Sequence, residues 1–374
     1  MKHKRENIDG IVLVPEDSEN FLNQRQLADY KEHRKTLIEW MLHLGKDPER
    51  AEGYAFDTAR QRSYKLDRFY RWVWTEVEDR YTLGITPEHA DKYTEELVYG
   101  DTSHTYKAGV QKAIKTLFKW QNWEKDRNID WEPKIKFTNG GSATHQPRDF
   151  LTDRERRLIK EAALEYGSIP HYNSITPEER DKWKIHLAQR LEKPKGEIGP
   201  QDFERANGWK YPSMIWATMD AGFRPKEVGR AKVSWLDLEN GLLRIPKDES
   251  TKNTDNWTVV VSERTANILR KWVSERENYE KYRGSDALWL TKYGNPYSSQ
   301  SLNRLLDKLR DAAGIPEQRE MTWYSIRHSV GTKMNDDKGP GAVQQQLRQK
   351  SYEMAIRYDQ SPPGKRRKAI DSWD

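Results

Sequence analysis

Cysteine is absent from this chain of 374 residues. Its absence excludes disulfide bridges, thiolate zinc sites and cysteine nucleophiles, and it fits a reducing compartment. The N-terminus is basic, but no apolar run is long enough for a signal peptide or a membrane span. We therefore expect a cytoplasmic protein that does not associate with a membrane.

Several catalytic signatures are also missing. The chain has no P-loop and no dinucleotide-binding glycine fingerprint, and its nine histidines do not fall at metal-ligand spacings. No pair of carboxylates stands in an acid–base context. These absences count against hydrolases and redox enzymes, and we expect neither a metal ion nor another cofactor. Arginines, lysine and tyrosine remain, which suit an anionic phosphoryl transition state attacked by a phenolic oxygen.

Basic residues are in slight excess, with 65 Lys and Arg against 59 Asp and Glu and a formal net charge of +6. This balance permits a polyanionic partner without requiring one. The 15 tryptophans and 18 tyrosines supply large apolar surfaces, which indicates a folded protein. Because the length exceeds the usual size of one hydrophobic core, we expect two domains.

Residues 21–131 are predicted to form a helical domain after an N-terminal tail, residues 1–20. Apolar residues recur at helical spacing in two stretches: Leu66, Phe69, Tyr70 and Val73, and then Val110, Ile114, Leu117 and Phe118. Basic residues occupy other positions of the same two stretches and are expected to face outward: Arg60, Arg62, Lys65 and Arg68, and then Lys107, Lys112, Lys115 and Lys119. Two basic helix faces suit a phosphate backbone, and they fit a solvated surface equally well.

Residues 132–149 are rich in Gly, Pro, Ser and Thr and form the best linker candidate. A second domain is predicted over residues 150–360. Two pairs have capping-box spacing and mark helix starts in this domain: Thr152 with Glu155, and Thr176 with Glu179. Residues 170–210 form a long segment that could be packing or a partner surface.

Strand patterns are few. Residues 241–250 and 256–263 are short runs separated by a polar turn, which indicates a β-hairpin. The chain after them is again periodic in the manner of helices. The predicted fold is therefore mainly α with a small antiparallel β-sheet.

Four segments, in this order, resemble the motifs of the tyrosine recombinases, also called phage integrases. They are "MDAGFRPKEVGRAKVSWLDLENGLLRIP", "DESTKN", "YSIRHSVGT" and "LRQKSYEMAIRYDQ". The helical stretch before residue 130 is similar to the core-binding domain of that family. The resemblance implies a helical DNA-binding domain followed by a mixed α/β catalytic domain.

The resemblance also implies catalytic roles. Arg224 and Arg327 match the two arginines that would grip the non-bridging oxygens of the scissile phosphate. Lys252, in the hairpin turn, would protonate the departing 5′-hydroxyl as a general acid. Tyr358 matches the nucleophile that would form a 3′-phosphotyrosyl link.

Other residues compete with these or support them. Lys247 is the competing lysine and is expected in the first strand of the hairpin. Tyr352 is the rival nucleophile and is expected to serve in packing. Glu227 is expected in a supporting role, and His328 is expected to be a buried histidine that supports the loop.

Two positions depart from the family pattern. Tyr324 stands three residues before the second arginine, where the family most often has histidine. Gln349 stands nine residues before Tyr358, where histidine or tryptophan is usual. Both side chains can hydrogen-bond a phosphate oxygen, but neither is a good base near neutral pH. We count both as catalytic candidates and expect a slow enzyme.

The resemblance implies a site-specific DNA recombinase, or integrase, that binds double-stranded DNA in the nucleoid. It would be a monomer or weak oligomer when free and a homotetramer on two DNA sites, exchanging strands through a Holliday junction. Two alternatives stay open: DNA relaxation like that of type IB topoisomerases, and a catalytically weakened DNA-binding protein on a recombinase scaffold. Residues 361–374 are either a solvated charged tail or a segment that docks on a neighbouring protomer.

Overall fold

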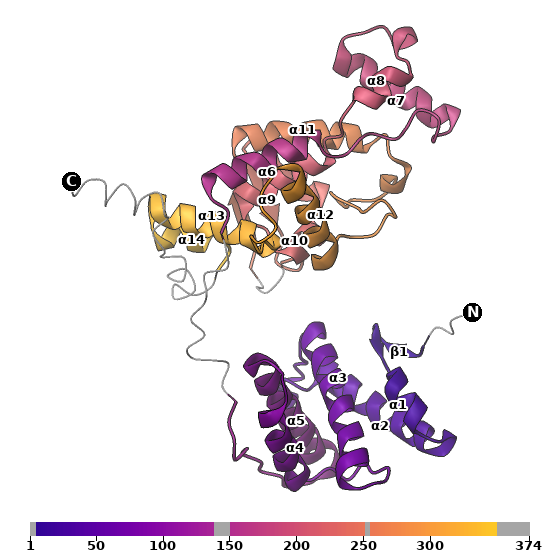
Figure 1. Cartoon of the computed structure of the whole chain (residues 1–374), viewed down its shortest axis with the longest axis vertical. Coiled ribbons are helices and arrows are strands. Elements are labelled where there is room, and N and C mark those ends of the chain that lie inside the picture. The colour runs from indigo at the N-terminus through magenta and orange to yellow at the C-terminus, as the bar shows by residue number, and fades with distance from the viewer. Residues whose placement is uncertain (1–4, 138–149, 251–254, 350–374) are drawn as a thin grey trace, which may run out of the picture. The chain divides into compact units, whose positions relative to one another are not determined.

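The computed structural model describes residues 5–137, 150–250 and 255–349. The chain divides at residue 145 into two compact units (Figure 1), and each unit has its own hydrophobic core. Helices predominate in both units, and the strands form small antiparallel sheets. The predicted fold, mainly α with a small antiparallel sheet, is confirmed.

The first unit is a set of helices preceded by a short hairpin. Its elements are β1 (Asn7–Ile8), β2 (Ile11–Val12), α1 (Glu16–Phe21), α2 (Gln24–His43), α3 (Phe56–Trp72), α4 (Pro87–Tyr99) and α5 (His104–Lys125). The expectation of a tail over residues 1–20 is wrong for its described part. Ile11 and Val14 are buried in the core of this unit, so the segment folds onto the helices that follow it.

The helices α3 and α5 pack against each other as their sequence periodicity predicts. Leu66 and Phe69 of α3, and Ile114 and Leu117 of α5, are all buried in the shared core. Burial of apolar surface along one stripe of each helix holds the pair together.

The second unit begins with α6 and contains the three-stranded sheet. Its elements are α6 (Asp153–Glu165), α7 (Pro177–Leu191), α8 (Pro200–Arg205), α9 (Lys210–Ala221), α10 (Pro225–Arg230), β3 (Leu236–Asp237), β4 (Leu242–Ile245), β5 (Trp257–Val260), α11 (Glu263–Arg276), α12 (Ser299–Ala312), α13 (Trp323–Lys338) and α14 (Pro340–Gln346). Both predicted capping boxes are present: the Thr152 and Thr176 hydroxyls accept from the backbone N–H groups of Glu155 and Glu179.

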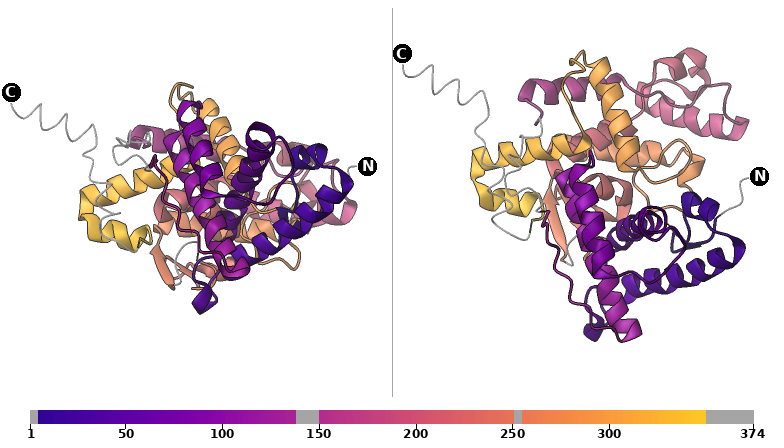
Figure 2. Two further views of the ribbon diagram at one scale, coloured as in Figure 1. Left: turned by 90° about the horizontal axis from the view of Figure 1, so that it is seen from below. Right: turned by 60° about the horizontal axis from the view of Figure 1, so that its bottom comes forward.

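The predicted hairpin is formed by β4 and β5, which pair antiparallel with Leu243 opposite Val259. A third strand, β3, adds to the outer edge of β4. Sequence reasoning missed β3 because two residues are too short to carry an alternating pattern. The central helix of the unit is α9, which packs against α6, α11 and α13. Helices α13 and α14 lie side by side in both views of Figure 2.

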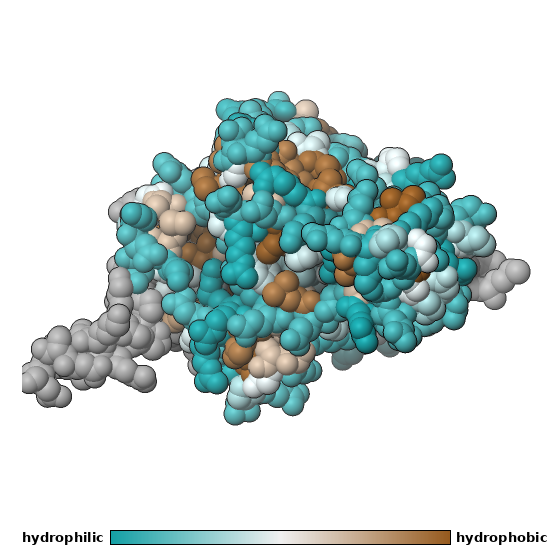
Figure 3. Space-filling view, turned by 90° about the horizontal axis from the view of Figure 1, so that it is seen from above, coloured by the Kyte–Doolittle hydropathy of each residue, from teal (hydrophilic) through white to brown (hydrophobic). Residues whose placement is uncertain are grey.

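Helices α7 and α8 stand apart from the rest of the second unit (Figure 1 and Figure 2, right). They enclose a small core of their own, which includes Trp183, Leu187, Ile198 and Phe203. The long segment 170–210 is therefore a packed subdomain. On the face of the molecule in Figure 3, hydrophilic residues predominate and the hydrophobic ones form small groups between them.

Candidate active site

Arg224 lies at the turn between α9 and α10. The chain leaves α9 through Gly222, whose φ of +59° is in the left-handed region. A side chain there would also clash, because a Cβ on Gly222 would lie 2.3 Å from Cδ2 of Leu347. Arg224 is the residue before Pro225 and has extended backbone, which suits a residue that precedes proline. Its side chain is half-buried.

Arg327 lies in the first half of α13 and is fully buried. Its Nη1 donates to the carbonyl of Gly222 at 2.6 Å, and its Nη2 donates to the carbonyl of Leu347 at 2.5 Å. The second predicted arginine therefore joins the end of α9 to the end of α14. The fold thus brings together the motif that contains Gly222 and the motif that contains Arg327, which lie 105 residues apart in the sequence.

Glu227, in α10, is the carboxylate at which the arginines meet. Its Oε1 accepts from Nη1 of Arg224 at 2.8 Å, and its Oε2 lies 4.0 Å from Nη1 of Arg327. Burial would raise the pKa of Glu227, but the charges of Arg348, Arg224 and Arg327 outweigh burial and lower the pKa to about 2. The supporting catalytic role expected for Glu227 stays a prediction.

Arg348 is a member of the cluster that sequence reasoning missed. It follows α14, is 1% exposed, and its Nη2 donates to Oε2 of Glu227 at 2.7 Å. The residue stands within the motif "LRQKS", but an isolated arginine in a sequence gives no sign that it is buried. The cluster therefore contains three guanidinium groups around one carboxylate.

The two positions that depart from the family pattern both lie near this cluster in the chain. Gln349 is nearly buried and directly follows Arg348. Tyr324 is half-buried on α13, and its ring meets the ring of His328 edge-on, with centroids 5.0 Å apart. The expectation that His328 is buried and supports a loop is wrong: it lies within α13, one turn after Tyr324, and is half-buried.

Tyr358, Tyr352 and Lys252 lie outside the described residues. Lys247 is described, and it follows β4 instead of lying in the strand as expected, because β4 ends at Ile245. Its side chain is exposed and its backbone N–H donates to Oδ1 of Asn256 across the hairpin, at 2.8 Å.

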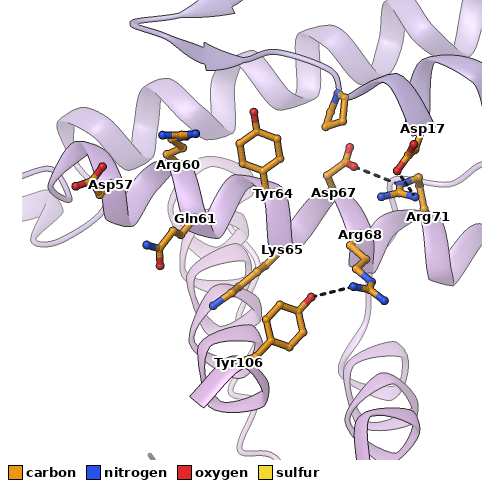
Figure 4. A pocket seen from close by; sticks show the side chains of 11 residues that line it. Asp17, Asp57, Arg60, Gln61, Tyr64, Lys65, Asp67, Arg68, Arg71 and Tyr106 are labelled. Atoms are coloured by element: carbon orange, nitrogen blue, oxygen red, sulfur yellow. Dashed lines mark hydrogen bonds and ion pairs between the residues drawn. The ribbon is translucent and has the colours of Figure 1, made fainter. Parts of the chain in front are cut away.

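The basic side of α3 borders a pocket of about 780 Å³ in the first unit (Figure 4). Its lining includes four basic residues, two tyrosines and three aspartates: Arg60, Lys65, Arg68, Arg71, Tyr64, Tyr106, Asp17, Asp57 and Asp67. Nη1 of Arg68 donates to the hydroxyl of Tyr106 at 3.5 Å, and the ammonium of Lys65 lies 5.4 Å from the centre of the Tyr106 ring. Burial, reinforced by the charges of Arg62 and Lys112, lowers the pKa of Lys65.

The other predicted DNA-binding residues divide into two groups. Lys107 was expected to face outward, but it is 7% exposed, and its Nζ donates to the carbonyl of Val98. Arg62 is half-buried and donates to the Thr116 hydroxyl at 2.7 Å. Lys112 and Lys115 are exposed as expected.

Among the described residues, no helix combines the length and apolar character needed to cross a membrane. None of their histidine, aspartate and glutamate side chains gather in a group of three that could hold a metal ion.

A sequence model of the phage integrase family matches residues 204–363, the segment that contains Arg224, Glu227, Arg327 and Arg348. No curated protein matches the chain.

Three solved structures show the same fold. The XerH site-specific recombinase bound to a palindromic difH substrate, in a post-cleavage complex, is 16% identical over 97% of this chain and 91% of that chain, with a TM-score of 0.56. The Tn1549 transposon integrase in complex with transposon right end DNA is 11% identical over 90% and 98%, with a TM-score of 0.52. A lambda integrase tetramer bound to a Holliday junction is 14% identical over 87% and 77%, with a TM-score of 0.50.

The matched segment carries the buried arginine cluster, and the fold agrees over most of the chain. Residues 204–363 of the chain are thus similar to the phage integrase, or tyrosine recombinase, family.

Proposed function

We propose that this protein is a site-specific DNA recombinase that cuts and rejoins duplex DNA through a 3′-phosphotyrosyl intermediate. The observation that carries the proposal is the cluster formed by Arg224, Arg327, Arg348 and Glu227. Guanidinium groups stay charged at all relevant pH values, and the pKa of Glu227 is about 2. At neutral pH these four side chains therefore carry a net charge of +2, from three cations and one anion.

An excess of positive charge in a nearly dry site suits an anionic ligand. A buried charge is stabilised by an opposite charge with hydrogen bonds, and planar guanidinium groups match the oxygens of a phosphodiester. Arg224 is half-buried, so its guanidinium is the member of the cluster best placed to reach a phosphate from solvent. Its carboxylate partner, Glu227, orients it.

The proposed reaction is an exchange of phosphate esters. The phenolic oxygen of Tyr358 attacks phosphorus, the P–O bond to the 5′-oxygen breaks, and a tyrosyl ester to the 3′-phosphate forms. Lys252 donates a proton to the departing 5′-oxygen, with Lys247 as the alternative, and the phenol releases its proton to water. A 5′-hydroxyl from another strand reverses these steps, so the bond energy is conserved.

The first unit would hold the DNA. The pocket beside α3 offers Arg60, Lys65 and Arg68 to phosphate oxygens, and Tyr64 and Tyr106 add hydroxyl groups at its wall. These contacts read no bases by themselves, so they position the duplex for the second unit.

Recombination between two sites would proceed through a homotetramer and a Holliday junction. The lambda integrase of similar fold forms a tetramer on such a junction. In this proposal the free protein is a monomer or weak oligomer that assembles on its DNA in the cytoplasm.

Covalent capture tests the proposal. The protein is incubated with fragments of its own element and host genome, denatured, and the DNA that stays attached is sequenced. Discrete adducts are expected from the wild type and from Tyr352→Phe, and none from Tyr358→Phe. Binding to discrete sites with no adduct in any of these proteins contradicts the proposal and favours a non-catalytic DNA-binding protein. Relaxation of supercoils without discrete sites favours topoisomerase-like activity.

A further inference from the structure

Arg348 occupies a backbone conformation that does not favour arginine. Its φ is +54°, in the left-handed region that glycine adopts most readily. A non-glycine residue with this φ carries local strain, which surrounding contacts must offset. The side chain of Arg348 therefore supplies interactions that hold the residue in place.

Those interactions are made in the interior of the second unit. Nη2 of Arg348 donates to Oε2 of Glu227 at 2.7 Å, and Nη1 donates to the carbonyls of Ala221 and Gln346, each at 2.9 Å. The guanidinium carbon lies 5.5 Å from the centre of the Phe223 ring. This side chain ties the segment after α14 to α10 and to the end of α9.

We propose that Arg348 is a positioning residue for the strand-transfer reaction, an inference that rests on the proposed function. It acts through Glu227. Because one carboxylate receives Arg348 on Oε2 and Arg224 on Oε1, at 2.7 and 2.8 Å, its orientation depends on both partners. Removing Arg348 takes a charged donor from Oε2, which the backbone N–H of Arg224 also contacts at 2.7 Å, so the carboxylate is held less firmly and the guanidinium of Arg224 shifts with it.

The backbone around Arg348 strengthens the coupling. The carbonyl of the preceding residue, Leu347, accepts from Nη2 of Arg327, and the following residue is the catalytic candidate Gln349. Arg348 therefore fixes the relative positions of groups on three segments: Arg224, Arg327 and Gln349. Its own guanidinium is 1% exposed and donates to Glu227 and to the carbonyls of Ala221 and Gln346, so it acts on the reaction through these groups.

The test uses the full-length protein and two substitutions. Arg348→Gly removes the guanidinium and suits the left-handed backbone. Arg348→Lys keeps the charge, but a single ammonium cannot span Glu227 and both carbonyls. The first readout needs no DNA: it is the side-chain NMR resonance of the Arg224 guanidinium, assigned by its loss in Arg224→Lys. Thermal unfolding checks that each variant is folded.

The second readout is single-turnover adduct formation on the site found by covalent capture, with DNA affinity measured in parallel. For Arg348→Gly we expect a shifted and broadened Arg224 resonance, a cleavage rate about 100-fold lower, and a DNA Kd within about threefold of wild type. Arg348→Lys should lie between wild type and Arg348→Gly in both resonance and rate. A misplaced catalytic group slows chemistry without weakening the many phosphate contacts.

Two outcomes overturn the inference. One is an unchanged Arg224 resonance and an unchanged rate in Arg348→Gly. The other is a rate loss that equals the loss of folded protein, with the remaining molecules fully active, because that pattern is purely structural. Failure of the proposed function is distinct from both: the wild type itself then forms no adduct, whatever happens to the Arg224 resonance.

Discussion

At the residue scale, the main feature is the carboxylate of Glu227, which stays ionised although its burial opposes ionisation. Glu227 is 3% exposed, and burial is the largest influence on its pKa, yet three guanidinium groups reverse the direction of the shift. Loss of one partner from such a buried group of charges is usually strongly destabilising.

The first prediction concerns this carboxylate and acid. The pKa of Glu227 falls from 4.5 in the unfolded chain to about 2 in the folded one, so its stabilising effect is present above pH 4.5 and is lost as pH falls towards 2. Over that window the loss is on the order of 3 kcal/mol. In urea unfolding of Glu227→Gln the deficit relative to wild type should be largest above pH 4.5 and shrink by this amount towards pH 2.

The matched control is Glu161→Gln, because Glu161 is an exposed glutamate on α6. Its unfolding free energy should follow that of the wild type at each pH. A constant deficit for Glu227→Gln across the whole range would contradict the depressed pKa.

At the element scale, the ends of helices decide how the second unit is assembled. The end of α9 packs on Leu347 through Gly222, and the start of α9 is capped by another helix. That cap is Glu275 of α11, whose carboxylate accepts from the backbone N–H of Trp209 at 3.0 Å. Both ends of the central helix are thus controlled by distant segments.

The second prediction concerns the turn after α9. Gly222→Ala adds a Cβ at a φ of +59° and pushes against Leu347, so the free energy of unfolding should fall by more than about 1 kcal/mol. Gly196→Ala is the control, since a Cβ there meets nothing within 4 Å. Equal unfolding midpoints for the two variants in urea would contradict the close packing at Gly222.

The third prediction concerns Glu275. Burial raises its pKa to about 7, against the opposing effect of the Trp209 N–H and the charge of Arg190. Since the unfolded carboxyl ionises near pH 4.5, the folded state binds more protons between pH 4.5 and 7, and stability falls as pH rises through that window. The loss is on the order of 3 kcal/mol.

Glu275→Gln keeps an oxygen for the Trp209 N–H and cannot ionise. Urea unfolding across pH 4.5 to 7 should therefore be flatter for this variant than for wild type. Glu277→Gln, an exposed neighbour, should keep the wild-type slope. The slopes from Glu275 and Glu227 have opposite signs, so together these two residues favour a stability maximum near pH 4.5.

At the scale of the whole molecule, the proposed association with DNA would depend on charge. A polyanion binds a protein partly by releasing counterions, and the number of neutralised phosphates sets the dependence of affinity on salt. The pocket beside α3 brings Arg60, Lys65 and Arg68 to one side of the first unit (Figure 4).

The fourth prediction follows from the number of phosphates that these three residues would neutralise. Replacing Arg60, Lys65 and Arg68 with alanine should reduce the slope of log affinity against log salt by about 2 to 3, since each phosphate contact contributes about 0.9. Fluorescence anisotropy with a labelled duplex over a salt series measures the slope.

The control removes the same charge elsewhere in the unit, through alanine at Lys31, Lys46 and Arg80, which pair with glutamates outside the pocket. Its slope should stay close to that of the wild type. Equal loss in both triple variants would mean that net charge, and not the α3 pocket, governs binding.

Local features of the chain were predictable from the sequence. The capping boxes at Thr152 and Thr176 and the α3 and α5 periodicities depend on residues within one or two helical turns of each other, and the β4–β5 hairpin joins two strands that follow each other in the chain. The resemblance to tyrosine recombinases likewise rests on short motifs in a fixed order. It pointed to Arg224 and Arg327, which both lie within 4.0 Å of Glu227, and their catalytic roles stay a prediction.

Features that join distant segments were not predictable. Lys107 has the spacing of an outward lysine, but the carbonyl of Val98 and the helices packed around it enclose its ammonium. Residues 7–21 carry no strong pattern, yet Ile11 and Val14 find a core built by helices further along the chain.

The sequence by itself determined the helix starts, the hairpin and the order of the motifs that resemble those of tyrosine recombinases, because short-range spacing encodes them. Only the tertiary structure decided that Arg348 meets Glu227, 121 residues away, and completes a buried cluster with Arg224 and Arg327. The physical reason is that burial and net charge at a site are sums over every segment that packs there, and no single segment contains that sum.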